Sequence, residues 1–213
     1  MLPLRDHLPT RSVPWVNYAL IAANVAAMGA EVTFEGAERW ALVPSQLLAH
    51  PLAAAPTLLT HMFLHANVAH LAGNMLFLWI FGDNVEDYFG HFGYLLFYFA
   101  CGIGSDLTHI LFNLHSPVPA LGASGAISGV MGAYIVLFPR ARVLTLVFIF
   151  FLPIPAFIIL GYWFLLQFLA GITSVGTAAT GGTAWWAHIG GFILGMLITF
   201  MSMGSKRTYE PSY

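Results

Sequence analysis

Six long apolar segments constrain this sequence more than any other feature. They lie at about 13–30, 62–81, 92–111, 122–138, 143–172 and 185–203. Each is long enough to span a hydrocarbon layer of about 30 Å at about 1.5 Å per helical residue. Pro153 and Pro155 interrupt the fifth, so we expect its spanning helix to begin near Ala156 and residues 143–152 to lie along the inner surface. The sequence therefore predicts an all-α, polytopic membrane bundle of six transmembrane helices.

Composition supports the membrane assignment. The 213-residue chain is 59% hydrophobic and 8% charged, which leaves too little polar surface to cover a soluble globule. Its net charge is −2 and its basic residues are dispersed, so no surface for nucleic acid is indicated. The single cysteine, Cys101, lies within an apolar segment and predicts neither a disulfide framework nor a cysteine-based metal site.

The positions of lysine and arginine favour one orientation of six spans. With the N-terminus in the cytoplasm, all basic residues except Arg39 are cytoplasmic, namely Arg5, Arg11, Arg140, Arg142, Lys206 and Arg207. We therefore expect a short cytoplasmic N-terminus (1–12), a membrane domain (13–203) and a short cytoplasmic tail (204–213). A cleaved signal peptide over the first segment is the alternative, but it would leave an odd number of spans and spoil this charge pattern.

The first loop, residues 31–60, mixes acidic and apolar side chains and contains three prolines, Pro44, Pro51 and Pro56. It is too broken for a span and too apolar for a free linker. The composition predicts a loop that lies in the membrane interface.

A glycine-rich stretch, residues 121–134 (LGASGAISGVMGAY), places Ser124 between Gly122 and Gly125. Another backbone or a substrate can approach such a serine closely, because the two flanking glycines have no side chains. Small residues also recur four apart along the expected helix, namely Gly125 with Gly129 and Ser128 with Gly132. This spacing suits close helix contact in lipid. Taken alone, the stretch fits a packing surface with an incidental serine equally well.

Polar side chains within the second span are functional candidates, because each is costly in lipid unless it faces the bundle interior or water. Asn67, His70 and Asn74 have the spacing of one helix face. Hydrogen bonds to neighbouring helices are the simpler interpretation, which we favour for Asn67. We expect His61 and His65 to turn away from this face and to bond loop backbone or water.

The sixth span carries His188 near its start, followed by Gly191 and Gly195 in Gly-x-x-x-Gly spacing. Small residues here would let this helix pack against the small-residue face of the fourth span. That contact would bring His188 toward Ser124. At about 1.5 Å per residue, both residues and His70 fall in the outer half of the bilayer, where they can share one site.

A serine beside a histidine predicts nucleophilic catalysis, because the imidazole can accept the hydroxyl proton and return it to the leaving amine. The oxyanion of the tetrahedral intermediate then needs hydrogen-bond donors. His70, Asn74 and the backbone N–H of Ser124 can supply them. No aspartate in the spans has the spacing of a third member, so Ser124 and His188 are expected to act as a dyad.

These motifs resemble those of rhomboid intramembrane serine proteases, over essentially the whole chain. The matching residues are Gly-x-Ser-Gly at 122–125, Ala-His-x-x-Gly at 187–191 and His-x-x-x-Asn at 70–74. The stretch that follows Leu121 is similar to many bacterial members. The resemblance implies Ser124 as nucleophile, His188 as general base, and His70 and Asn74 as oxyanion donors. We expect Gly122, Gly125, Ser128 and Gly191 to support this site.

The resemblance also implies a reaction and a location. The substrate would be a single-pass transmembrane protein, cut near its outer end. The enzyme would be a multi-pass protein of the bacterial inner (cell) membrane with both termini in the cytoplasm. Expected partners are that substrate and the lipid bilayer, with no nucleic acid, no metal and no cofactor.

Position 128 departs from better-known members of the family. Where these often carry an aromatic ring that packs against the catalytic histidine, this sequence has Ser128. Its hydroxyl could instead accept a hydrogen bond from His188 Nδ1–H and fix the tautomer. The alternative is that Ser128 is merely small, so that two helices can approach. Asp106 and His109 in the third span are expected to form a buried structural pair.

Two other classes of function stay open. A metalloprotein could use His61, His65, His70 and His188, but no His-Glu-x-x-His motif is present and these histidines lie on different predicted faces. A catalytically inactive rhomboid-like protein would bind client transmembrane helices without cutting them. The retained serine and histidine favour the protease.

Overall fold

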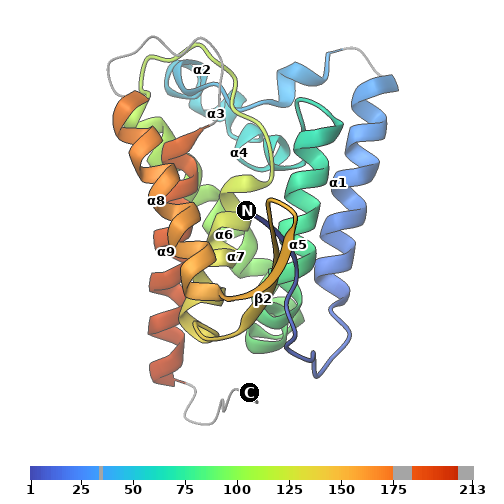
Figure 1. Cartoon of the computed structure of the whole chain (residues 1–213). Coiled ribbons are helices and arrows are strands. Elements are labelled where there is room, and N and C mark those ends of the chain that lie inside the picture. The colour runs from blue at the N-terminus through green and yellow to red at the C-terminus, as the bar shows by residue number, and fades with distance from the viewer. Residues whose placement is uncertain (34–35, 175–183, 206–213) are drawn as a thin grey trace.

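A bundle of helices forms the body of the protein (Figure 1). The computed structural model describes residues 1–33, 36–174 and 184–205. Within these ranges the bundle helices are α1 (Trp15–Thr33), α5 (Val68–Phe89), α6 (His91–Phe112), α7 (Ser124–Leu137), α8 (Ala156–Ser174) and α9 (Trp185–Ser205). Almost every side chain of α7 is buried, because α5, α6 and α9 surround it. The residues that begin α7 are therefore held at the centre of the bundle.

The first loop folds into short helices across one end of the bundle (Figure 1). They are η1 (Ala37–Trp40), α2 (Pro44–Ala49), α3 (Pro51–Ala54), α4 (Thr57–Thr60) and η2 (His61–Phe63). Proline begins both α2 and α3, where its missing N–H costs no helical hydrogen bond. The loop thus covers the end of the bundle at which α7 and α9 begin.

Length and composition identify membrane-crossing helices in the described ranges. The helices α6, α8 and α9 are long and apolar enough to cross alone. The segment Pro51–Phe63 and α5 qualify together as a fourth, although they are bent by 78° at the break between them. The helix α7 is apolar but has only 14 residues. The all-α, polytopic membrane bundle is confirmed, and the count of six spans stays a prediction.

Most helix positions agree with the sequence, and the second span is the exception. The helix α8 begins at Ala156 after the two prolines, as predicted. The helix α5 begins at Val68 and ends at Phe89, so the predicted range 62–81 was wrong at both ends. Asn67 sets the start, since its side chain accepts the N–H of His70 as an N-cap instead of bonding a neighbouring helix. At the other end polar residues continue the helix to Gly90.

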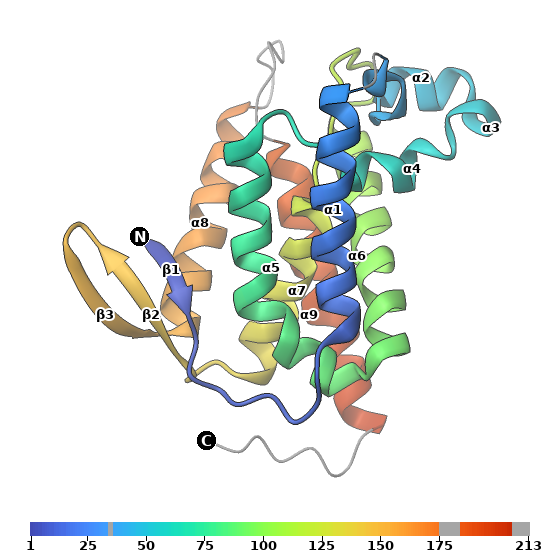
Figure 2. The same ribbon diagram turned by 90° about the vertical axis from the view of Figure 1, so that its right-hand side faces the viewer.

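A small antiparallel sheet, which the sequence did not predict, lies beside α8 (Figure 2). Its strand order is β1 (Leu2–Arg5), β2 (Arg142–Val147) and β3 (Phe150–Pro155). Residues 143–152 are therefore a hairpin, and its tip residue Phe148 is 93% exposed. Asp6 ties β1 to the bundle by accepting the hydroxyl of Tyr134 on α7. Burial raises the pKa of the Asp6 carboxyl, which favours its neutral form.

Glycines bring α7 and α9 into backbone contact. A Cβ atom added to Gly191 would lie 2.1 Å from the carbonyl oxygen of Gly125, and one added to Gly195 would lie 2.0 Å from that of Gly129. Any side chain at these positions would force the helices apart. The predicted close contact between the fourth and sixth spans is thus confirmed.

Candidate active site

Ser124 and His188 meet where α7 and α9 begin. Ser124 is the first residue of α7, and His188 lies in the first turn of α9. The Nε2 atom of His188 is 2.7 Å from Ser124 Oγ. The backbone contact between Gly125, which directly follows Ser124, and Gly191, three residues after His188, holds the two helix starts together. The geometry is that of a hydroxyl hydrogen-bonded to a base that can take its proton.

Gly122 shapes the chain just before Ser124. Its φ of 117° lies in the region that favours glycine. Its N–H donates to the carbonyl of His61 at 2.9 Å, which fixes the turn to the first loop. A Cβ atom on Gly122 would lie 2.9 Å from His70 Nε2 and 3.6 Å from Asn74 Nδ2. The structure therefore brings both side chains of the predicted oxyanion site to the backbone that precedes Ser124.

His65 belongs to the same group, contrary to the prediction that it turns away from His70. The Nδ2 atom of Asn74 is 3.0 Å from His65 Nε2, and the two histidine rings are 5.1 Å apart. The break in the helix before α5 places His65 over this face, which continuous helical geometry does not allow. Glu31, near the end of α1, accepts the backbone N–H of His65 at 3.1 Å. His65 thus helps to hold the Asn74 amide.

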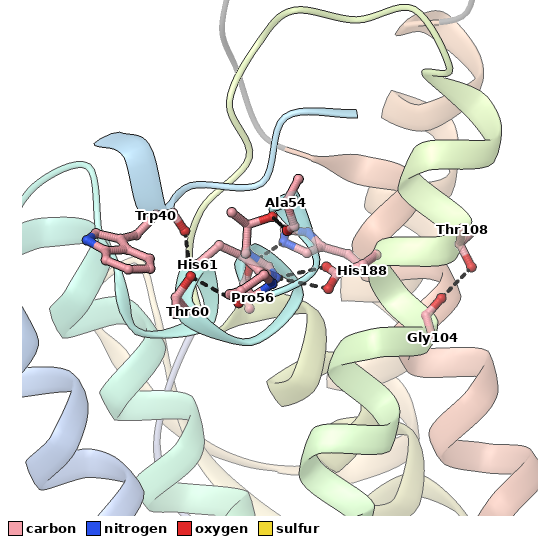
Figure 3. A network of polar contacts seen from close by, with 11 residues as sticks. Trp40, Ala54, Pro56, Thr60, His61, Gly104, Thr108 and His188 are labelled. Atoms are coloured by element: carbon pink, nitrogen blue, oxygen red, sulfur yellow. Dashed lines mark hydrogen bonds and ion pairs between the residues drawn. The ribbon is translucent and has the colours of Figure 1, made fainter. Parts of the chain in front are cut away.

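His61 forms a buried pair with Asp106 of α6. The His61 Nε2 atom is 3.0 Å from the carboxylate. Figure 3 shows the polar network around His61. The predicted bond between Asp106 and His109 was wrong, as was the prediction that His61 bonds loop backbone or water through its ring. The pair anchors the end of the first loop, where the His61 carbonyl accepts the N–H of Gly122.

Ser128 does not orient His188. Its hydroxyl donates to the Ser124 carbonyl at 2.6 Å. Its Cβ atom lies 3.4 Å from where a Cβ atom on Gly191 would be. Of the two roles considered for Ser128, the hydrogen bond from His188 Nδ1 is therefore not formed, because that nitrogen bonds another residue. The buried position between α7 and α9 fits the alternative, a residue that is small so that the helices can approach.

Two residues of α8, which the sequence interpretation missed, occupy the other side of the His188 ring. Gln167 Oε1 is 2.7 Å from His188 Nδ1. The Trp163 ring lies 5.7 Å from the His188 ring, at an angle of 35°. Gln167 had a signal in the sequence, because an amide within a long apolar span is costly unless it has a partner.

Both hydrogen-bond partners of His188 are uncharged groups. Its two nitrogens face a hydroxyl and an amide oxygen, and no carboxylate of the described residues hydrogen-bonds to the ring. Across the described ranges, no group of three or more His, Cys, Asp or Glu side chains is placed to hold a metal ion. The geometry thus supports a dyad and gives no support to the metalloprotein interpretation.

Comparison with known proteins gives consistent matches. Residues 54–205 match the family model described as Rhomboid domain. The chain is 31% identical over 192 residues to Rhomboid protein 1, mitochondrial, of Saccharomyces cerevisiae, covering 84% of this chain and 51% of that protein. It is 47% identical over 76 residues to Rhomboid protease GluP of Bacillus subtilis, covering 36% of this chain and 14% of that protein.

A plant protein gives a similar match. RHOMBOID-like protein 12, mitochondrial, of Arabidopsis thaliana is 31% identical over 151 residues, covering 63% of this chain and 43% of that protein. The chain therefore spans about half the length, or less, of these curated relatives.

Proposed function

We propose that this chain, which belongs to the rhomboid family, is an intramembrane serine endopeptidase that cleaves single-pass transmembrane proteins near the outer membrane face. The observation that carries the proposal is the 2.7 Å separation between His188 Nε2 and Ser124 Oγ. Family membership alone does not assign activity, since the relatives' names include both a protease and rhomboid-like proteins. The paired nucleophile and base support the protease.

In the proposed reaction Ser124 Oγ attacks the scissile carbonyl while His188 Nε2 takes the hydroxyl proton. The imidazolium then gives this proton to the leaving amine, and an acyl-enzyme ester remains on Ser124. Water hydrolyses the ester, with His188 again acting as base. His70, Asn74 and the Ser124 N–H donate hydrogen bonds to the oxyanion in both steps.

The proposed orientation places the Ser124 end of the bundle outside. Arg140 and Arg142 follow the opposite end of α7, and the positive-inside rule assigns that end to the cytoplasm. We accordingly propose cytoplasmic N- and C-termini and a location in a bacterial inner membrane. The bacterial relative is consistent with this location, and the mitochondrial relatives show that the family also occurs in organelles.

Cleavage of model substrates tests the proposed function. The purified protein in liposomes is incubated with a panel of single-span proteins, with and without a chelator, and the products are mapped by mass spectrometry. We expect cuts near the outer end of the substrate span that the chelator does not affect. Binding without cleavage would instead identify an inactive rhomboid-like protein, and activity lost to the chelator would identify a metalloenzyme.

The oxyanion donors are tested by His70→Ala and Asn74→Ala. Each variant should lower kcat by about 100-fold or less at nearly constant KM, because the donors act on charge that develops in the transition state and other donors remain. Steady-state kinetics in liposomes measure both constants, with His115→Ala in the exposed α6–α7 connection as control. Weaker substrate binding at unchanged kcat would make the two residues substrate-positioning groups instead.

A further inference from the structure

We propose that Gln167 is a positioning residue that holds His188 in the tautomer and orientation needed to take the proton of Ser124. The side chains form a continuous chain of hydrogen bonds from α8 through α9 to α7. Both separations, from Gln167 Oε1 to His188 Nδ1 and from His188 Nε2 to Ser124 Oγ, are 2.7 Å. The inference rests on the proposed function, because it assigns a third participant to the same dyad.

The role follows from the two forms of a neutral imidazole. One ring nitrogen carries a hydrogen and the other accepts, so Nε2 is free for the Ser124 proton only when the hydrogen is on Nδ1. An amide oxygen can only accept, so the bond to Gln167 Oε1 selects this form. When Nε2 takes the proton, Nδ1–H stays bonded to Gln167, and the charged donor strengthens that bond. Gln167 itself neither gains nor loses a proton.

Burial shows that the Gln167 side chain has turned away from lipid. It is 7% exposed, whereas the preceding residues on α8, Leu165 and Leu166, are 50% and 43% exposed. A primary amide inside an apolar span is costly unless its polar atoms are bonded. The hydrogen bond from His188 Nδ1–H satisfies the Gln167 amide oxygen. It also gives His188 the acceptor that keeps the hydrogen on Nδ1.

Trp163 adds a second contact from the same face of α8. It precedes Gln167 by four residues, which is about one helical turn, and its ring lies 5.7 Å from the His188 ring. Rotation of the imidazole would break the bond to Gln167 and disturb this ring contact together. The orientation of His188 is thus set from α8, while the position of Ser124 is set from α7.

A purely structural bond between α8 and α9 is the alternative, and kinetics separate the two. Gln167→Met keeps the length of the side chain and removes the acceptor, so kcat should fall about tenfold at unchanged KM and Tm, as expected for one neutral hydrogen bond. Gln167→Glu keeps an acceptor oxygen at the same reach and should recover kcat to within about threefold of the parent. Leu166→Met, on the exposed side of α8, is the matched control and should equal the parent.

The outcomes are distinguishable from failure of the proposed function. If the parent protein cleaves substrate and Ser124→Ala does not, the proposed function stands. That conclusion does not depend on the result for the Gln167 variants. Parental kcat in Gln167→Met, or equal losses in the Met and Glu variants, would overturn the positioning role. A lower Tm with unchanged kcat of the folded fraction would also overturn it. If Gln167→Met does not reach the parental Tm, Gln167→Asn, which withdraws the amide by one methylene, makes the same comparison.

Discussion

Replacement of Ser124 or His188 by alanine is expected to abolish proteolysis and leave the fold intact. The two side chains act as one unit, so each single variant should lose about 1,000-fold or more in kcat and the double variant little beyond that. Cleavage of a single-span substrate in liposomes measures the loss, and Tm measures the fold. Both residues lie at helix starts, where alanine is sterically accepted and leaves the glycine contacts between α7 and α9 in place.

Ser128→Ala is the matched control for this pair. Ser128 lies four residues after Ser124 on α7 and bonds only the Ser124 carbonyl among the described residues. The change keeps the small side chain between the helices, so near-parental kcat is expected. Substantial turnover by Ser124→Ala would contradict the mechanism.

Gly195→Ala is expected to have the second large effect, on both stability and activity. The added Cβ atom would lie 2.0 Å from the Gly129 carbonyl oxygen, a backbone atom that no rotamer change can move. Overpacking of this kind costs about 1–3 kcal/mol or more, and here it separates two helices. His188 is two turns earlier on α9, so its distance to Ser124 should lengthen. We expect a lower Tm and loss of most proteolysis.

Gly161→Ala provides the control for the glycine substitution itself. Gly161 lies on α8, and apart from its chain neighbours and the backbone of its own helix no described atom lies within 4 Å of an added Cβ there. Alanine is favoured over glycine within helices by about 1 kcal/mol, so Tm should stay equal or rise. If Gly195→Ala had parental Tm and activity, the glycine contact would not determine the distance between Ser124 and His188.

The juxtaposition of Ser124 and His188 was predictable because local patterns encode it. Apolar segments define the helices, and small residues at four-residue intervals mark the surfaces of α7 and α9 that meet. The two sets of glycines then align the starts of the helices. A pairing that depends on two regular helices in close contact can be inferred from spacing alone.

Other features depend on where the chain leaves regular geometry. The break before α5 puts His65 beside Asn74, and helical spacing extended through the break gives the opposite answer. The Asp106 carboxylate pairs with His61 and not with the predicted His109, because the first loop folds against α6. Such choices arise from tertiary packing between distant segments.

The β-sheet and Gln167 were missed for different reasons. Residues 143–152 are almost uniformly apolar, so the alternation that marks a strand is hidden, and the pairing with β1 spans most of the chain. The role of Gln167 depends on how α8 rotates against α9, which apolar composition does not specify. Because an amide in lipid is costly, the sequence indicates that Gln167 has a bonding partner, but it does not indicate which residue that partner is.

Covalent labelling of Ser124 tests the central claim most directly. A fluorophosphonate reacts with a serine whose hydroxyl is activated by a neighbouring base, and mass spectrometry of the digested protein locates the adduct. The account predicts one adduct, on Ser124, that disappears in His188→Ala at parental Tm. An adduct on Ser128, labelling that persists without His188, or no adduct in the folded parent protein would contradict it.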